Sequence, residues 1–227
     1  MKRLTAFEQI LIGWFFFIAI LICCRMYFSG SLLFIFLVWN LFLAWIPFAV
    51  SNYLSQPKRN RWITYSILAV WLLFFPNSLY IITDLIHIDH DTDVPKWFDA
   101  ILIFSAAVLG LLMAFISLYR VERFMRLKLR GRLADVLLLL TLFLGSFGVY
   151  LGRFLRWNSW DVISNPGKLI ISIGSRILFP FEHLYTWGVT SVLTVLFYLI
   201  YFSAKKLPGY LFRANQENNK DRLEVES

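Results

Sequence analysis

Long apolar runs, most of them close to twenty residues, are separated by shorter polar segments along this sequence. An α-helix needs about 20 apolar residues to cross the hydrocarbon core of a bilayer, whereas a transmembrane β-barrel shows short segments of alternating polarity. The pattern therefore predicts an all-α fold, a polytopic transmembrane helix bundle. Six spans are expected, at about 8–28, 32–50, 62–84, 98–119, 133–152 and 185–203.

The third span is interrupted by Pro76 and then carries a row of polar residues. Proline removes one backbone hydrogen bond, so a carbonyl near Leu72 needs another partner. If the helix continues, the polar residues share one face, because they are spaced three, four, three and four apart. Such a seam is expected to face a water-filled pocket, a polar helix or a bound ion. Its members are Asn77, Tyr80, Asp84, His87 and Asp91.

Within this row, Asp84 and His87 pair a carboxylate with an imidazole at helical spacing, as in helix bundles that hold divalent metals. Asp91 follows one turn later, and His183, on the same predicted side of the membrane, could complete the ligand set. The alternative is that these groups are solvated where the span meets water, with Tyr80 as an interfacial anchor. The pattern leaves both interpretations open.

The segment GRFLRWNSWD, residues 152–161, leaves the fifth span on the same predicted side. Arg153 and Arg156 lie one helical turn apart, and Asn158 follows them. Because a guanidinium fork suits carboxylate or phosphate, this group is a candidate for binding an anionic group or for pairing with Asp84. Anchoring at the membrane boundary is the alternative.

After the turn signal Asn165-Pro166-Gly167, residues 168–178 place polar side chains on one helical face and apolar side chains on the other. This predicts an amphipathic helix within the last extracytoplasmic loop, lying in the interface on that side of the membrane. The helix would form a lid or floor for the polar row. The polar face holds Lys168, Ser172, Ser175 and Arg176.

Small and polar residues inside the spans predict helix contacts. Gly145, Gly148 and Gly152 recur at helical spacing in the fifth span, which lets a neighbouring backbone approach closely. Asn40 lies in the middle of the second span and needs a hydrogen-bonding partner there.

Composition and charge indicate how the chain is oriented. With 59% hydrophobic and only 16% charged residues, it is unlike an ordinary soluble domain. Sixteen of the 22 Lys and Arg residues lie in the N-terminus, segments 51–61 and 120–132, and the tail, so the positive-inside rule places both termini in the cytoplasm. The net charge of +8 then requires no nucleic-acid partner. We expect one transmembrane domain, 1–204, and a polar cytoplasmic tail, 205–227.

Four segments carry a resemblance to a known family: NLFLAWIPF (40–48), FFPNSLYIITDLIH (74–87), WFD (97–99) and GRFLRWNSWD (152–161). Together they resemble the bacterial integral membrane proteins grouped as a domain of unknown function, DUF1361. In that family a proline often stands where this chain has Leu79. The resemblance implies a multi-pass protein of the bacterial cytoplasmic (plasma) membrane and brings no catalytic residues with it.

The leading functional hypothesis is a membrane-embedded site that faces the extracytoplasmic side. Asn77, Tyr80, Asp84 and His87 would line it, and metal-assisted or acid/base hydrolysis or group transfer on a lipid-linked or cell-envelope substrate is the expected chemistry. The first rival is a small transporter or an ion or proton pathway through Asp84 and His87. The second is a non-catalytic protein whose outer loops bind a membrane protein partner.

Overall fold

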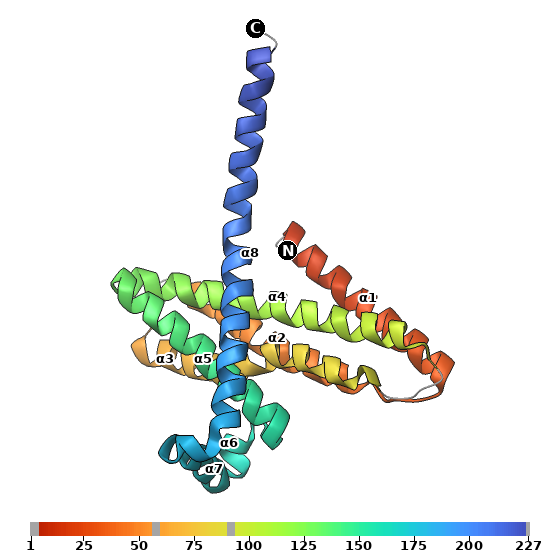
Figure 1. Cartoon of the computed structure of the whole chain (residues 1–227), viewed down its shortest axis with the longest axis vertical. Coiled ribbons are helices and arrows are strands. Elements are labelled where there is room, and N and C mark those ends of the chain that lie inside the picture. The colour runs from red at the N-terminus through yellow and green to blue at the C-terminus, as the bar shows by residue number, and fades with distance from the viewer. Residues whose placement is uncertain (1–4, 56–59, 90–93, 226–227) are drawn as a thin grey trace.

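The computed structural model describes residues 5–55, 60–89 and 94–225. Within these ranges the regular structure is entirely helical (Figure 1). The long helices are α1 (Ala6–Ser29), α2 (Phe36–Asn52), α3 (Arg61–Tyr80), α4 (Lys96–Lys128), α5 (Gly131–Leu155) and α8 (Leu184–Val225). The short ones are η1 (Tyr53–Ser55), η2 (Ile81–Asp89), α6 (Asp161–Ser164), α7 (Pro166–Leu178) and η3 (Pro180–His183).

Each predicted span coincides with a long helix, which confirms the predicted fold class. In the described part of the chain, five helices are long and apolar enough to cross a membrane, and α2 is a shorter apolar helix of 17 residues. The protein is thus a multi-pass helical membrane protein. The helix predicted over 168–178 is found as α7, which begins two residues earlier, at Pro166.

Local sequence signals explain where α1 begins and ends. Thr5 and Glu8 form a reciprocal capping box, in which the Thr5 hydroxyl accepts from the Glu8 amide and the Glu8 carboxylate accepts from the Thr5 amide. The helix ends at Gly30, whose φ of 61° is a left-handed conformation that glycine adopts without steric cost.

Helix α3 is central to the packing, because it contacts α2, α4 and α5. On α5, Gly148 lies directly against Pro76, and a Cβ atom on this glycine would be 2.5 Å from the proline Cγ. One turn away, a Cβ on Gly145 would be 2.9 Å from the Phe75 ring. The prediction that these glycines permit close helix contact is confirmed.

The structure corrects two predicted boundaries. The polar row does not continue as α-helix, because α3 ends at Tyr80 and the chain tightens into the 3₁₀-helix η2. Helix α4 runs to Lys128 rather than to residue 119, so most of the predicted 120–132 loop is helical. Hydropathy identifies only the apolar part of a helix that lies in the hydrocarbon core. Helix α4 continues past this part with polar residues that hydrogen-bond to one another, such as Glu122 and Arg126.

Two buried ion pairs join helices at opposite ends of the bundle. Arg25 of α1 donates to both carboxylate oxygens of Asp99 in α4, at 2.7 and 3.1 Å. At the other end, Glu122 of α4 accepts from Arg126 at 2.7 Å and from Lys205 of α8 at 2.5 Å. These contacts fix α1 and α8 on α4.

Helix α8 packs on α5, crosses the other helices at a steep angle and extends well beyond them, so that its C-terminal part stands clear of the bundle (Figure 1). The segment predicted as a polar tail continues this helix as far as Val225. At the other end of α8, the short helices α6 and α7 lie together beside the end of α5 (Figure 1).

Candidate functional site

Asp84 is a buried carboxylate at the end of the bundle where α3 passes into η2. It is only 1% exposed, and each of its oxygens accepts a hydrogen bond. Asn40 Nδ2 of α2 donates to Oδ2 at 2.9 Å, and Arg153 Nη2 of α5 donates to Oδ1 at 2.8 Å. Three helices therefore meet at this one side chain, and the arginine neutralises its charge.

Arg153, in the last turn of α5, connects Asp84 to its neighbours. Its Nη1 donates to the Tyr80 hydroxyl at 3.1 Å, and its Nη2 also donates to the Thr83 carbonyl. The guanidinium carbon lies 4.9 Å from the centre of the Tyr80 ring, within the range of a cation–π interaction. Sequence reasoning left open whether this arginine pairs with Asp84 or binds an anionic group, and the structure shows the pairing.

The change from α-helix to 3₁₀-helix decides what Asp84 faces. Residues three apart are eclipsed in a 3₁₀-helix, so Asp84 shares its face with Ile81 instead of with Tyr80. Both Ile81 and Asp84 are buried. Tyr80 remains connected to Asp84 because the fork of Arg153 reaches both.

A second polar contact lies one turn earlier on α3. The Asn77 amide donates to Ser159 Oγ at 2.9 Å, and this hydroxyl donates to the Leu73 carbonyl at 3.1 Å. Pro76 interrupts the backbone ladder here, and the loop after α5 supplies a donor to the affected turn. The sequence-based expectation of a carbonyl partner near Leu72 is met at the next residue.

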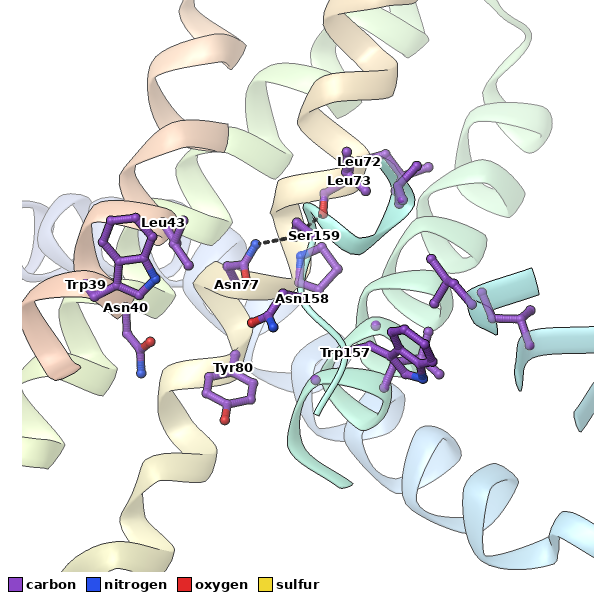
Figure 2. Close-up of a pocket in the computed structure, with 17 residues that line it drawn as sticks. Trp39, Asn40, Leu43, Leu72, Leu73, Asn77, Tyr80, Trp157, Asn158 and Ser159 are labelled. Atoms are coloured by element: carbon purple, nitrogen blue, oxygen red, sulfur yellow. Dashed lines mark hydrogen bonds between the residues drawn. The ribbon is translucent and has the colours of Figure 1, made fainter. Parts of the chain in front are cut away.

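These contacts surround a pocket of about 270 Å³ between α2, α3, α5, α7 and the loop after α5. Figure 2 shows the side chains of Asn40, Asn77, Tyr80 and Asn158 arranged around it, with Asn77 bonded to Ser159. The apolar part of the lining includes Trp39, Leu43, Trp157, Leu169 and Ile173. The pocket thus has amide and hydroxyl groups on one part of its wall and apolar surface on another.

A second hollow of about 370 Å³ adjoins the first. Asn40 and Tyr80 line both, and Asp84 and Arg153 line only the second. The buried ion pair is therefore next to the amide-lined pocket and shares two of its wall residues.

The loop after α5 is held by Asp161 and by an unusual backbone conformation. The Asp161 carboxylate accepts from the Asn158 backbone amide at 2.7 Å and from the Ser164 hydroxyl at 2.8 Å, and these bonds lower the pKa of the Asp161 carboxyl. Arg156, the C-cap residue of α5, has a φ of 59°, and its exposed side chain forms no ion pair with the residues that the structure describes. This turn directs Asn158 towards the pocket.

Helix α7 closes one side of the pocket, as the predicted lid or floor would. Trp157 Nε1 donates to Ser172 Oγ at 3.2 Å, and Arg176 donates to the Ser172 carbonyl at 2.5 Å. The opposite face of α7 is apolar and exposed, with Ile170, Ile171 and Leu178 all more than two-thirds exposed. An exposed apolar face of this kind suits the membrane interface.

Comparison with known protein families shows which family the chain belongs to. Residues 39–200 match the family model described as protein of unknown function, DUF1361. The chain belongs to the DUF1361 family. No curated protein and no solved structure matches it. The matched region of this DUF1361 member contains Asn40, Asp84 and Arg153, so the whole ion-pair site lies inside the family domain.

Some of the predicted site residues of this DUF1361 domain lie together in the structure, and others lie outside the described residues. Asn77, Tyr80, Asp84, Arg153 and Asn158 line one or both hollows. The side chain of His87 and the whole of Asp91 lie outside the described residues, so their predicted roles stay predictions.

The predicted metal site receives no further ligands from the described residues. His183 lies in η3, which contacts α7 and α8. Among the residues that the structure describes, no group of three or more His, Cys, Asp or Glu side chains could hold a metal ion. Each Asp84 oxygen accepts one hydrogen bond, from Asn40 or from Arg153, and the predicted metal role of Asp84 stays a prediction.

Two members of the site, Ser159 and Asn40, were not among the site residues predicted from the sequence. Asn40 was expected to have a hydrogen-bonding partner, and that partner is Asp84. A signal was available, because a lone amide in one apolar span and a lone carboxylate in the next are both costly unless paired. Ser159 gave no comparable signal, since serine is common in loops.

Proposed function

We propose that this membrane protein binds the polar head of an amphiphilic, lipid-linked or cell-envelope molecule in the two adjoining hollows that share Asn40 and Tyr80, here called the Asp84 site, and acts on it by acid/base hydrolysis or group transfer. The observation that carries the proposal is the two-part lining of the 270 Å³ pocket, polar around Asn77 and Asn158 and apolar around Trp39 and Ile173. An amphiphile offers the matching pair of surfaces. The distribution of Lys and Arg supports an orientation in which this pocket faces the extracytoplasmic side, and we place the protein in the bacterial cytoplasmic membrane as part of this proposal.

The position of the pocket supports a ligand that arrives from the membrane. Helix α7 forms part of its wall through Leu169 and Ile173, while Ile170 and Ile171 on the same helix are exposed. A helix with its apolar face in the interface would bring the pocket to the level of lipid head groups. A lipid-linked molecule could then place its head among the amides while its tail stays in the bilayer.

Tyr80 has the hydrogen-bonding state required of an acid towards such a ligand. Its hydroxyl oxygen accepts from Arg153 at 3.1 Å, and an arginine cannot take a proton in return. The Tyr80 proton is therefore available to a group in either hollow, both of which this residue lines. We assign Tyr80 the role of hydrogen-bond donor and general acid.

Asp84 acts as a positioning residue in this proposal. It holds the Arg153 guanidinium at 2.8 Å and the Asn40 amide at 2.9 Å, so it fixes the group that binds the Tyr80 hydroxyl and an amide that lines both hollows. His87 is the candidate base, as the sequence pattern suggested.

The test first identifies the lipids that stay bound to the protein during purification. Full-length protein would be extracted from its membrane in a mild detergent, and bound lipids would be identified by liquid chromatography and mass spectrometry. The comparison is between wild type and Asn158→Leu, which removes an exposed amide from the pocket wall. Asn165→Leu is the matched control, because Asn165 is an exposed asparagine outside the pocket.

We expect wild type and Asn165→Leu to retain an amphiphile that is enriched over the bulk membrane lipids, and Asn158→Leu to lose it. Tyr80→Phe should retain the molecule but fail to convert it on incubation, whereas wild type should release a product. Bulk lipid composition in all variants would refute the binding site. Retention without product in both wild type and Tyr80→Phe would refute catalysis and leave a binding protein.

A further inference from the structure

A third, larger pocket lies at the opposite end of the bundle from Asp84. Its volume is about 820 Å³, and it is formed by the start of α3, the last third of α4, η1 and Leu137 of α5. It shares no lining residue with the Asp84 site. Any role it has is therefore separate from the function proposed above.

Basic side chains dominate the charge of this pocket. Among the described residues, its lining holds Arg61, Arg120, Arg123 and Lys128 and no Asp or Glu. Arg123 and Lys128 are exposed, and neither forms an ion pair within the part of the chain that the structure describes. The positive charge of the pocket is thus uncompensated by its own wall.

Arg120 is held in place by neutral groups and forms no ion pair among the residues that the structure describes, although Glu8 of α1 interacts with it electrostatically. Its Nη1 donates to the Phe48 carbonyl at 3.1 Å and to Ser51 Oγ at 3.1 Å, and its guanidinium carbon lies 4.6 Å from the centre of the Phe48 ring. These neutral contacts orient the guanidinium but leave its charge in place. An arginine fixed in this way is ready to meet an anion.

The nearest acid along α4, Glu122, cannot neutralise the pocket, because three other groups bind it. Arg126 donates to it at 2.7 Å and Lys205 at 2.5 Å, and the Tyr201 hydroxyl also donates to it. Glu122 is 1% exposed, and its partners include α8, which lines no part of the pocket.

The rest of the wall is apolar with tyrosines among it. Ile67 and Leu68 of α3 and Leu137 of α5 line the pocket, and Tyr65 and Tyr119 are exposed beside the basic groups. Tyrosines next to basic residues at the ends of membrane helices are typical of the level of lipid head groups. A free anion would use only the charged part of this wall, whereas a phospholipid would use both parts.

We propose that this basic pocket binds an anionic phospholipid, with the phosphate held by Arg120, Arg123 and Lys128 and the acyl chains lying along Leu68 and Leu137. Basic pockets between transmembrane helices on the positively charged side of the membrane are a known setting for such head groups. The occupant is a single lipid molecule with a defined site, and it ties α3 to the end of α4.

The test uses native mass spectrometry of the full chain in detergent, titrated with phosphatidylglycerol or with phosphatidylcholine of the same acyl chains. The test variant is Arg123→Gln/Lys128→Gln, whose two side chains are exposed and make no ion pair with the described residues. The control is Lys206→Gln/Arg213→Gln, which removes the same charge from exposed positions of α8 outside the pocket.

We expect wild type and the control to bind one phosphatidylglycerol in preference to phosphatidylcholine. The pocket variant should bind phosphatidylglycerol roughly 30-fold more weakly, since each basic residue near a membrane contributes about a fivefold preference for anionic lipid. Leu137→Trp, which fills the apolar part and keeps the charge, should also weaken binding. Equal binding of the two lipids, or equal loss in the pocket variant and the control, would overturn the proposal. Inorganic phosphate that competes with phosphatidylglycerol at millimolar concentration would overturn its assignment to a lipid.

Discussion

Replacing Asp84 by leucine should destabilise the protein more than replacing Asp84 and Arg153 together. The single change removes an acceptor from Asn40 and from Arg153 and leaves the guanidinium, whose side chain is 12% exposed, without its counter-charge. Breaking one partner of a buried pair costs about 3–5 kcal/mol of unfolding free energy. Arg153→Met should cost a similar amount, because it strands the carboxylate and also releases Tyr80 and the Thr83 carbonyl.

The double variant Asp84→Leu/Arg153→Met leaves no buried charge at this position. Its remaining cost comes from the unpaired Asn40 amide and Thr83 carbonyl, and one or two such groups amount to about 1–3 kcal/mol. The two single changes would sum to about 6–10 kcal/mol if they were independent. The double-mutant cycle should therefore show a coupling of several kcal/mol.

Unfolding in mixed micelles with an increasing fraction of dodecyl sulfate, followed by circular dichroism, supplies the four free energies. Arg156→Met is the matched control, because Arg156 is exposed and lies outside the ion-pair network, and it should change stability by less than about 0.5 kcal/mol. A double variant whose cost equals the sum of the single costs to within about 0.5 kcal/mol would refute the pairing argument.

Three further predictions concern the packing of α5 and the loop that follows it. Gly148→Ala should destabilise by about 1–3 kcal/mol, because its Cβ would lie 2.5 Å from a rigid proline ring, whereas Gly188→Ala, in open space on α8, should stabilise by about 0.5–1 kcal/mol in the same unfolding assay. Arg156→Gly should raise stability by about 1 kcal/mol, because φ at this position is 59°, and a loss of stability would contradict this. The bonds that lower the pKa of Asp161 stabilise the folded protein above the ordinary pKa of an aspartate and lose this effect as pH falls through the lowered value. Asp161→Asn should therefore flatten the acid limb of a stability–pH profile, and an unchanged limb would show that the Asn158 bond contributes nothing.

The positions of the membrane helices could be predicted from the sequence, because membrane insertion depends on hydropathy, which is a local property. The spans around Trp71 and Leu142 were predicted within a few residues for this reason. The sequence was insufficient to predict where α3 ends. There the change to 3₁₀-helix accompanies close packing of Ile81 and Ser78 on Gly110. That contact is a tertiary effect and leaves no periodic signal.

The candidate site was predicted in part, and the difference has a physical cause. Asp84, Tyr80 and Arg153 were recognisable because charged and polar groups are rare in apolar spans. Their connection through Arg153 depends on the register between α3 and α5, which Gly148 and Gly152 set by close contact with Pro76 and Tyr80. Register between helices cannot be read from either helix alone. Composition therefore identified candidate groups, and packing decided which of them meet.

The Arg25–Asp99 pair affects how this family domain can be isolated. Asp99 lies inside the matched region, 39–200, whereas Arg25 lies before it, on a helix that packs on α4. A shortened protein that starts at residue 39 would keep a carboxylate that is now 3% exposed and remove the guanidinium that binds both of its oxygens. We therefore expect the recognisable family segment to be less stable on its own than within this chain. Supplying α1, in the same polypeptide or as a separate fragment, should restore the pair and the lost stability.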